Sequence, residues 1–213
     1  MATKTVAVFG ATGRSGKPFV PRALAAGHRV RALARTPSKM TPQKHAQLTV
    51  IEGDVLDPKT VEQVVQGADV VVSLLGHAKG SPPDVQTRGT QNILSAMKKH
   101  GVGRIVSLTG GGVPYERDQP GFPDKLIRFI MKIVAKDVLN DGVNHAAAIR
   151  SSGLDYVIVR GPRLTEGEEK GSYKIGYVGT TGGTSISRAD LADFLLKVVN
   201  DQQYDGTMPF VSY

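Results

Sequence analysis

The chain has 213 residues, 40% of them hydrophobic and 22% charged, which suits one globular domain with a full core and excludes a disordered or fibrous protein. It contains no cysteine, so disulfides, thiol nucleophiles and Cys-ligated metals are excluded, and its five histidines lack metal-ligand spacing, so we expect no metal site. The net charge of +8 permits nucleotides, nucleic acid or a membrane surface as anionic partners without choosing among them.

The N-terminal segment and the aromatic content limit the expected cellular location of the protein and the expected kinds of binding partner. No basic region leads into a long apolar stretch, and no apolar run approaches the ~20 residues that a membrane-spanning helix needs. We therefore expect no secretory signal and a cytoplasmic location. Aromatic residues make up only 6% of the chain and do not alternate with basic residues as stacking platforms, so nucleic acid is not expected as a partner.

Apolar runs typical of strands alternate along the chain with segments of helical periodicity. In chain order the sequence predicts a strand at 5–9, a helix at 15–26, strands at 28–34 and 48–52, a helix at 60–66, a strand at 69–75, a helix at 87–100, a strand at 104–109, a helix at 125–137, a strand at 154–159 and a helix at 188–200. Such alternation implies right-handed βαβ crossovers and a parallel sheet. The predicted fold class is α/β, a Rossmann-type doubly wound parallel sheet in a single domain over residues 1–213, with a substrate pocket formed by loops 76–88, 110–124 and 161–184.

The strongest functional signal is the sequence Gly-Ala-Thr-Gly-Arg-Ser-Gly at residues 10–16, which follows a predicted strand and opens a predicted helix. In a dinucleotide-binding turn, the first glycine permits the tight turn, the second lets the backbone approach a pyrophosphate, and the third allows close packing of helix on strand. Free N–H groups and the helix dipole then bind the anion. We therefore expect cofactor contacts from Gly10, Thr12, Gly13, Arg14, Ser15 and Gly16.

The end of the second predicted strand indicates which dinucleotide binds. NAD sites place Asp or Glu about 20 residues beyond the motif to hold the ribose hydroxyls, but this chain has Arg35 there. A guanidinium matches a 2′-phosphate and stacks on adenine, and Thr36, Ser38 and Lys39 follow as further donors. The predicted cofactor is therefore NADPH, and the alternative is a solvated basic loop.

These motifs and several shorter ones give the chain a resemblance to a known family. Beyond the glycine motif and Arg35 they are Gly53-Asp-Val-Leu-Asp57, Leu74-Leu-Gly76, Ala96-Met-Lys-Lys-His-Gly-Val102, Ser152-Gly-Leu154 and Tyr204-Asp-Gly206. On these residues the chain resembles, nearly end to end, the atypical short-chain dehydrogenase/reductases of the NAD(P)-binding, NmrA-like type. Within that group it is most similar to the flavin and biliverdin reductases.

The resemblance implies cofactor contacts outside the glycine motif. It implies that Asp54 and Val55 border the adenine, although Asp54 is also typical of a turn residue that caps the following segment. The remaining contacts that it implies are those of Leu75 and Gly76, under the cofactor, Thr109, beside the nicotinamide ribose, and Pro162.

The chain departs from the family in its proton-transfer residues. No tyrosine has a lysine four residues on, so alcohol–ketone chemistry through the usual Tyr-x-x-x-Lys pair is not expected. Gly110 stands where the flavin and biliverdin reductases often carry serine, and Arg163 stands where they carry histidine. A reductase of flavins or quinones survives both changes, because hydride passes directly from nicotinamide C4 to an electron-poor ring and the later proton comes from water.

Three residues are candidates for a catalytic role. Arg163 can stabilise an anionic reduced acceptor or bind a flavin phosphate, or it is a surface arginine on a loop. His77 follows the glycine at the end of the fourth predicted strand and can face the nicotinamide, or it is a loop histidine without a proton role. Thr109 is expected to hydrogen-bond the ribose rather than act as a general acid, since no acid or base is evident beside it.

The predicted helix at 125–137 carries four cations on one narrow stripe, Lys125, Arg128, Lys132 and Lys136, and apolar residues cover the rest. Such a helix is expected to bury most of its circumference and to pack over the edge of the substrate pocket. The alternative is a contact with a partner, a second subunit or an anionic membrane surface.

The sequence therefore predicts an NADPH-dependent reductase of a flavin, a quinone or a tetrapyrrole-like acceptor. Two alternatives remain open. One is an NmrA-like protein that binds NAD(P) and reports its redox state to a regulator without catalysis. The other is an epimerase or reductase of a nucleotide-linked sugar, whose members are longer and retain the tyrosine and lysine. We expect a monomer or weak dimer whose partner is the small-molecule acceptor, and a membrane surface is not expected as a partner.

Overall fold

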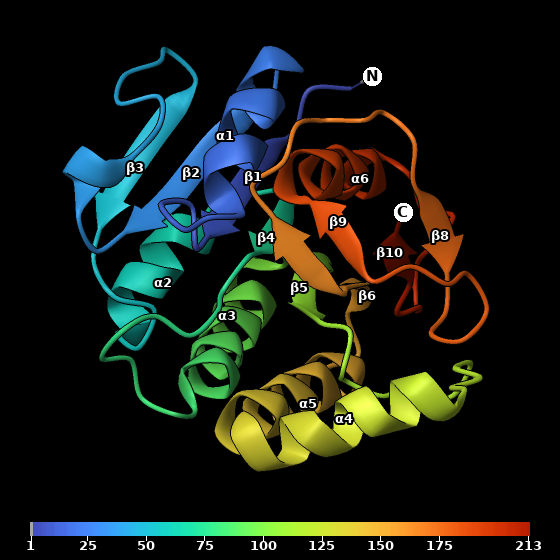
Figure 1. The fold of residues 1–213 in the computed structure, drawn as a ribbon. Coiled ribbons are helices and arrows are strands. Elements are labelled where there is room, and N and C mark those ends of the chain that lie inside the picture. The colour runs from blue at the N-terminus through green and yellow to red at the C-terminus, as the bar shows by residue number, and fades with distance from the viewer. Residues whose placement is uncertain (1) are drawn as a thin grey trace.

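The computed structural model describes residues 2–213, and its centre is a sheet of eight strands in the order β3-β2-β1-β4-β5-β6-β10-β8 (Figure 1). The strands of this sheet are β1 (Thr5–Phe9), β2 (Arg29–Ala34), β3 (Leu48–Glu52), β4 (Val70–Ser73), β5 (Arg104–Gly110), β6 (Asp155–Gly161), β8 (Lys174–Gly176) and β10 (Phe210–Ser212). Neighbouring strands run parallel except β8, which is antiparallel to β10. Two short strands, β7 (Arg163–Thr165) and β9 (Ser185–Ser187), pair separately.

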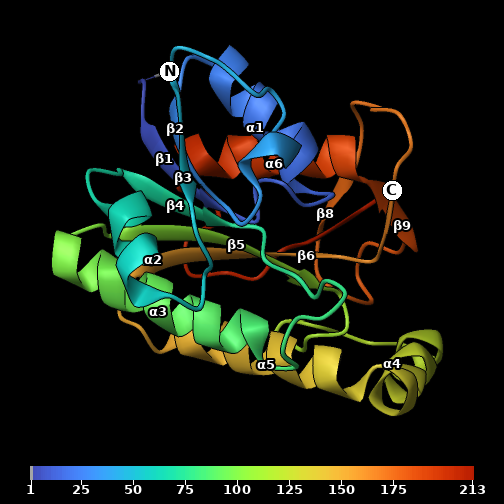
Figure 2. The same cartoon turned by 90° about the vertical axis from the view of Figure 1, so that its left-hand side faces the viewer.

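Helices cover both faces of the sheet, as Figure 2 shows. One face carries α1 (Gly16–Ala25) and α6 (Arg188–Asn200), and the other carries α2 (Pro58–Val65), α3 (Val85–His100) and α5 (Lys136–Arg150). A single turn, η1 (Pro37–Lys39), follows β2, and α4 (Phe122–Val134) precedes α5. Within residues 2–213, none of the helices combines the length and the apolar character needed to cross a membrane. The arrangement is a doubly wound sheet in one α/β domain, which confirms the predicted fold class.

The central strands are buried on both sides because nearly all of their residues are apolar. In β1, Val6 and Val8 belong to a cluster with residues of α1 and α6, whereas Ala7 and Phe9 belong to a cluster with residues of α2 and α3. All four side chains are fully buried. The alternation of side chains along the strand thus divides the core into two layers, one on each face of the sheet.

The strand order changes direction between β1 and β4, and ligands of such sheets bind at this switch point, outside the carboxyl ends of the strands. Gly10 follows β1 here with a φ of +81°. A Cβ at Gly10 would lie 2.5 Å from the carbonyl oxygen of Leu74, which follows β4. Glycine is therefore required on both grounds, and the topology brings the glycine motif to the switch point.

Apart from the helix at 125–137, the predicted elements are confirmed with small shifts at their ends. β4 ends at Ser73 rather than at residue 75, and α3 begins at Val85, inside the predicted loop 76–88. The predicted loop 161–184 contains β7 and β8, and the predicted loop 110–124 includes the first turn of α4. Helix α5 is missing from the predicted elements, although its apolar residues Leu139, Val143, Ala146 and Ile149 recur at helical spacing.

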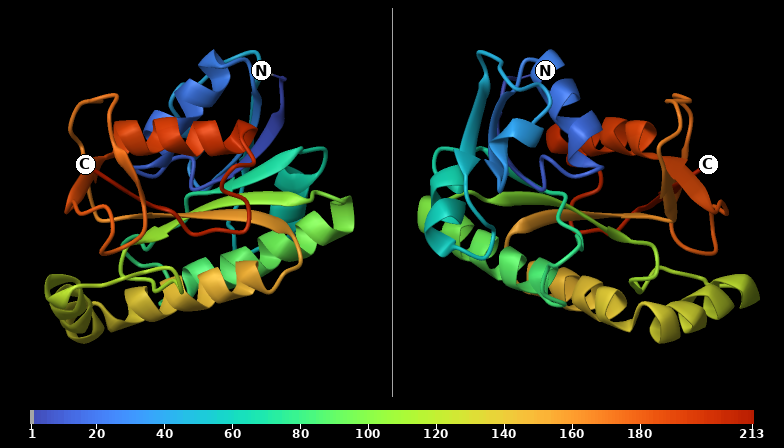
Figure 3. Two further views of the ribbon diagram at one scale, coloured as in Figure 1. Left: turned by 90° about the vertical axis from the view of Figure 1, so that its right-hand side faces the viewer. Right: turned by 60° about the vertical axis from the view of Figure 1, so that its left-hand side comes forward.

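The prediction for residues 125–137 is wrong in extent and in burial. The segment is not one helix, since α4 and α5 meet at Ala135 and Lys136 belongs to α5. No residue of α4 is buried, and Phe122 and Val134 are each 79% exposed. Figure 3 shows α4 at the end of α5, set apart from the other helices on that face. An apolar pattern predicts burial, but the break at Ala135 turns α4 away from the surface that would have covered it.

A buried ion pair holds two loops at the carboxyl edge of the sheet. Arg160 of β6 is fully buried, and its two terminal nitrogens each donate to a carboxylate oxygen of Asp118 at 2.7 Å. Arg160 also donates to the carbonyl of Val113, and Asp118 accepts from the N–H groups of Tyr115 and Val178. These hydrogen bonds satisfy both charges in the interior, so the pair stabilises one position of the loops that carry residues 113–118 and 178.

Two polar side chains on consecutive turns of α5 join it to α3. Asp141 is 3% exposed and accepts from the N–H groups of Gln86 and Thr87 at 2.9 and 2.8 Å. N–H groups in the first turn of a helix lack partners within it, so Asp141 caps α3 from a neighbouring helix. One turn later, Nδ1 of His145 lies 3.3 Å from Oγ1 of Thr90, and burial lowers the pKa of His145 to about 4.

We expect the buried His145 to make the protein less stable in mild acid. The unfolded chain takes up a proton near pH 6.5, whereas the folded protein resists it down to about pH 4. The contribution of neutral His145 to the free energy of unfolding is therefore complete above the pKa of the unfolded chain. About 3 kcal/mol of it is lost as the pH falls from that value to the pKa of the folded protein. In urea unfolding measured between about pH 7 and pH 4.5, the free energy of unfolding should decline less for His145→Gln than for the wild type.

The exposed His45 offers the matched control, and His45→Gln should keep the decline of the wild type. A parallel decline in His145→Gln and the wild type would contradict the assignment of the acid sensitivity to His145.

Candidate functional site

Two adjoining cavities open at the carboxyl ends of the parallel strands, beside the glycine motif. The large cavity, of about 600 Å³, extends from the motif to α4 and α5, and the small cavity, of about 270 Å³, extends to the ends of β2 and β3. The residues that line both are Thr12, Gly13, Leu74, Leu75, Gly76 and Ala78. Because the two cavities share these walls, they form one elongated site centred on the switch point.

The glycine motif is a tight turn into α1. The N–H of Gly13 donates to the carbonyl of Gly10 at 3.0 Å, and the N–H of Lys17 donates to the carbonyl of Gly13 at 3.0 Å. Gly16 is buried, and a Cβ there would overlap the carbonyl oxygen of Gly10, so this glycine serves packing. Ser15, at the N-cap, makes no side-chain capping hydrogen bond. The first turn of α1 is thus open to an anionic group at the positive end of its dipole.

The small cavity lies at the ends of two paired strands. Ala34 and Glu52 are register partners and end β2 and β3. Arg35 follows the first strand, Asp54 and Val55 follow the second, and all three line the small cavity. The Asp54 carboxylate also accepts a hydrogen bond from the N–H of Leu56 at 2.9 Å. Asp54 therefore acts as a turn residue and lines the cavity at the same time. The predicted donors that line neither cavity are Thr36, Ser38 and Lys39.

The large cavity is positively charged. Within residues 2–213 its lining contains no carboxylate, and its cations are Arg14, Lys17, Lys79 and Arg188. The guanidinium of Arg188 donates to the carbonyl of Leu164 at 3.1 Å and to Glu166 at 2.7 Å, but its buried Nε has no hydrogen-bond partner. Burial lowers the pKa of Arg188, and the charge of Arg14 lowers it further. A buried donor without a partner is rare, and the phosphates of a dinucleotide are anions that suit this set of donors.

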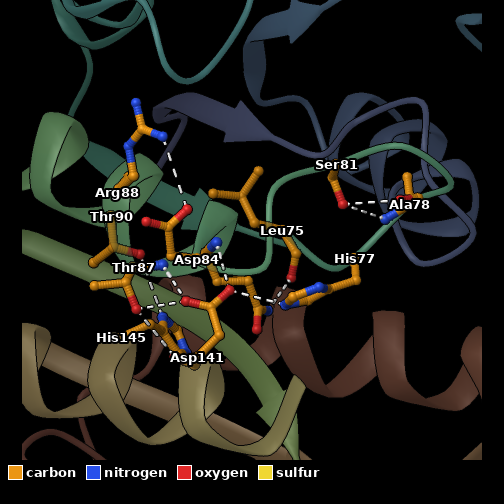
Figure 4. A network of polar contacts seen from close by, with 11 residues as sticks. Leu75, His77, Ala78, Ser81, Asp84, Thr87, Arg88, Thr90, Asp141 and His145 are labelled. Atoms are coloured by element: carbon orange, nitrogen blue, oxygen red, sulfur yellow. Dashed lines mark hydrogen bonds and ion pairs between the residues drawn. The ribbon is translucent and has the colours of Figure 1, made fainter. Parts of the chain in front are cut away.

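A histidine–aspartate pair stands on the wall of the large cavity. Nε2 of His77, which follows β4, lies 2.9 Å from Oδ2 of Asp141, and Figure 4 shows the two side chains pointing toward each other. The side chain of His77 is 19% exposed and that of Asp141 is 1% exposed. Since the same carboxylate caps α3, it holds the imidazole in one orientation. An oriented imidazole at a cavity wall can exchange a proton with a bound ligand.

The other two catalytic candidates have different surroundings. Thr109 is 6% exposed and lines the large cavity, where a Cβ at Gly142 of α5 would lie 3.2 Å from its Oγ1. Pro162 lines the same cavity. Arg163 is exposed at the start of β7, lines neither cavity, and donates its backbone N–H to the carbonyl of Thr184 at 3.3 Å.

The site has no counterpart of the proton-donating tyrosine of ordinary short-chain dehydrogenases. The chain has six tyrosines, all within the described residues 2–213, and none lines either cavity. Tyr115, which comes soon after β5, is buried and its hydroxyl donates to the carbonyl of Gly206 at 3.5 Å. The structure thus agrees with the absence of Tyr-x-x-x-Lys from the sequence.

Asp141, Arg188 and Lys79 are residues of the site that reasoning from the sequence misses, although Lys79 falls within the predicted pocket loop 76–88. Asp141 lies on the helix that the sequence does not predict, and the available signal is its four-residue spacing from His145, which puts both on one helix face. Arg188 directly follows Ser187, the N-cap of α6, whose side chain accepts from a backbone N–H of the first turn. That helix is predicted, but its start gives no sign that it reaches the cavity.

Comparison with known proteins identifies the family. Residues 10–202 match the family model described as NAD(P)H-binding. An uncharacterized protein of Mycobacterium tuberculosis is 35% identical over 109 residues, a match that covers 51% of this chain and 12% of the length of that relative. The reductase pytE of Aspergillus terreus is 28% identical over 258 residues, with 98% of both chains covered.

Solved structures share the fold. A short-chain dehydrogenase/reductase of Veillonella parvula in complex with NADP superposes with a TM-score of 0.83 at 19% identity, covering 100% of this chain and 95% of that one. ChuY, an anaerobillin reductase of Escherichia coli O157:H7, superposes with a TM-score of 0.80 at 21% identity, covering 98% and 96%. The matched family model and the glycine motif at the switch point therefore agree that this chain belongs to the NAD(P)H-binding family, as its resemblance to the atypical short-chain dehydrogenase/reductases implies.

Proposed function

We propose that the protein is an NADPH-dependent reductase that transfers hydride to a conjugated acceptor such as a flavin, a quinone or a tetrapyrrole-like compound. The proposal depends on one observation, a cavity of about 600 Å³ that runs from the glycine motif to the pair His77–Asp141, with cationic walls. A cavity of this size suits the nicotinamide end of a cofactor and part of a planar acceptor. The similarity to the reductase pytE and to the anaerobillin reductase supports a reductase.

The preference for NADPH over NADH depends on Arg35. It lines the small cavity directly after β2, where an acidic residue would hold the ribose hydroxyls of NADH. A guanidinium there pairs with the 2′-phosphate that only NADPH carries.

Arg35→Ala should weaken NADPH binding by about 2–3 kcal/mol, the usual contribution of a charge-assisted hydrogen bond, and should change NADH binding little. Titration of both cofactors by calorimetry measures the difference. Arg29→Ala removes an exposed arginine from the opposite end of the same strand and should leave both affinities unchanged. Equal losses for the two cofactors in Arg35→Ala would mean that Arg35 does not read the 2′-phosphate.

Residues on the walls of the large cavity would supply the other requirements of a hydride transfer. NADPH, when bound, supplies the hydride from C4 of its nicotinamide. Lys79 and Arg188 line the cavity and would offset the negative charge that develops on the acceptor, a role predicted for Arg163, which lies outside the cavity. Where the reduced acceptor does not take its proton from water, His77, oriented by Asp141, would donate the proton that completes the reduction. Hydride and proton together convert the acceptor to its two-electron reduced form and leave NADP⁺.

His77→Gln should separate two kinds of acceptor. A flavin or quinone whose anionic product takes its proton from water should keep its kcat/KM within about twofold, whereas an acceptor that needs a proton from the enzyme, such as an enone, should lose about 100-fold. Steady-state kinetics with FMN, a quinone and an enone measures both. His100→Gln, on α3 and outside both cavities, should change neither value. An equal loss for every acceptor would show that His77 only shapes the cavity.

The reductase itself is tested by following NADPH absorbance with FMN, FAD and a quinone. Oxidation of NADPH with any of them supports the proposal. The lack of a Tyr–Lys pair also suits the NmrA-like sensor, which binds NAD(P) without turning it over. Tight NADPH binding without oxidation by any acceptor would therefore overturn the reductase and favour the sensor.

A further inference from the structure

The outer side of α4 is an exposed apolar surface, which we name the α4 face. It consists of Phe122, Leu126, Ile127, Phe129, Ile130, Ile133 and Val134, whose exposed fractions are 79%, 47%, 54%, 60%, 50%, 68% and 79%. At 100° per residue these seven side chains fall within an arc of about 160°. Large contiguous apolar patches are uncommon on monomeric soluble proteins and mark contact surfaces.

The border of the α4 face carries positive charge. Lys125 and Lys132 lie directly beside the apolar arc on the helix and are exposed, and Lys136 begins the next helix. The one carboxylate of α4, Asp124, points elsewhere and accepts from the N–H of Gly121 at 2.9 Å in a capping box. The surface is thus apolar at its centre and cationic at one edge.

We propose that the α4 face docks on the surface of an anionic phospholipid bilayer. The helix has 13 residues and a length of about 20 Å, which is too short to cross a hydrocarbon core of about 30 Å. It fits instead in the interfacial plane, with its apolar side among the upper acyl chains and its lysines at the headgroups. The net charge of +8 adds attraction to anionic lipids.

Charge decides between a bilayer and a second copy of the chain. A second copy would bring another set of the same lysines and no free carboxylate on the α4 face to pair with them, whereas anionic headgroups supply the missing charge. The expectation that a membrane surface is not a partner assumed that this helix is buried, and the structure contradicts that assumption.

Docking in this way would bring the large cavity close to the bilayer. Met131 lies beside the other edge of the α4 face and lines the large cavity together with Val138 and Leu139 of α5. Val138 is 45% exposed, so the apolar wall continues from the cavity to the surface of the protein. The proposal concerns the surface alone and holds whether or not the cavity is catalytic.

A vesicle flotation assay with the full chain tests the proposal, using vesicles of phosphatidylcholine alone and of phosphatidylcholine with phosphatidylglycerol at about 7:3. The wild type should float with the anionic vesicles, and its binding should fall as salt is added. The double variant Phe129→Ser/Ile133→Ser should bind about tenfold less. Ile175→Ser, an exposed apolar change on β8, should bind like the wild type.

A matched pair of charge variants distinguishes the effect of the lysines beside the α4 face on vesicle binding from the effect of the net charge. Lys125→Glu/Lys132→Glu should lower binding about tenfold, whereas Lys44→Glu/Lys98→Glu, with the same change in net charge at exposed sites elsewhere, should lower it less than twofold. Circular dichroism and the thermal midpoint check that each variant is folded.

Three results would overturn the proposal. The first is that the wild type binds neither kind of vesicle. The second is an equal loss in the two charge pairs, which would assign binding to net charge alone. The third is a dimer, seen by light scattering, that Phe129→Ser/Ile133→Ser dissociates, which would make the α4 face a contact between subunits.

Discussion

The geometry of the site depends on the buried carboxylate of Asp141. Such a group is unfavourable in a protein interior unless its oxygens are satisfied. Here they accept from the first turn of α3, through Gln86 and Thr87, and they contact the ring of His77. One side chain of α5 therefore fixes three separate segments: α5 itself, the start of α3 and the chain that leaves β4. These segments supply one wall of the large cavity, and one requirement of solvation holds that wall in place.

Cations are placed along the whole site, and among the described residues that line it Asp54 is the one carboxylate. Arg35 lines the small cavity, Arg14 belongs to the glycine motif, and Lys79 and Arg188 line the large cavity. The helix dipole of α1 adds to them at the middle. A row of like charges is unfavourable in the free protein. The pKa of Arg188 is lowered by burial first, and the charge of Arg14 lowers it further. A polyanionic ligand relieves that repulsion, and the field also steers it toward the site.

The half of the site that lies near the N-terminus is predictable from the sequence because its determinants are local. Gly10 and Gly13 stand directly between an apolar strand and a helix, and the turn chemistry is read from adjacent residues. The other half depends on contacts between distant segments. The pairing of His77 with Asp141 joins residues 64 apart in the chain, and the sequence contains no local mark of it.

The same distinction explains two further features, the exposure of α4 and the position of Arg163 outside both cavities. The apolar pattern of α4 predicts burial, yet burial needs a partner surface that only the tertiary arrangement supplies or withholds. Arg163 and Arg188 both carry guanidinium groups near the end of a strand, and which of them reaches the cavity depends on the pairing of β7 with β9. A periodic pattern describes one element at a time and does not decide such cases.

The ion pair of Arg160 and Asp118 has a consequence for how the rim of the large cavity moves. Residues 113–118 and Val178 are bonded to this pair, and Arg160 belongs to a central strand of the sheet. Local opening of the rim would expose a buried guanidinium without its partner, so these residues belong to the same cooperative folding unit as β6. The rim of the large cavity at Val113 is therefore expected to open only together with the sheet, which leaves the exchange of ligands to other parts of the boundary.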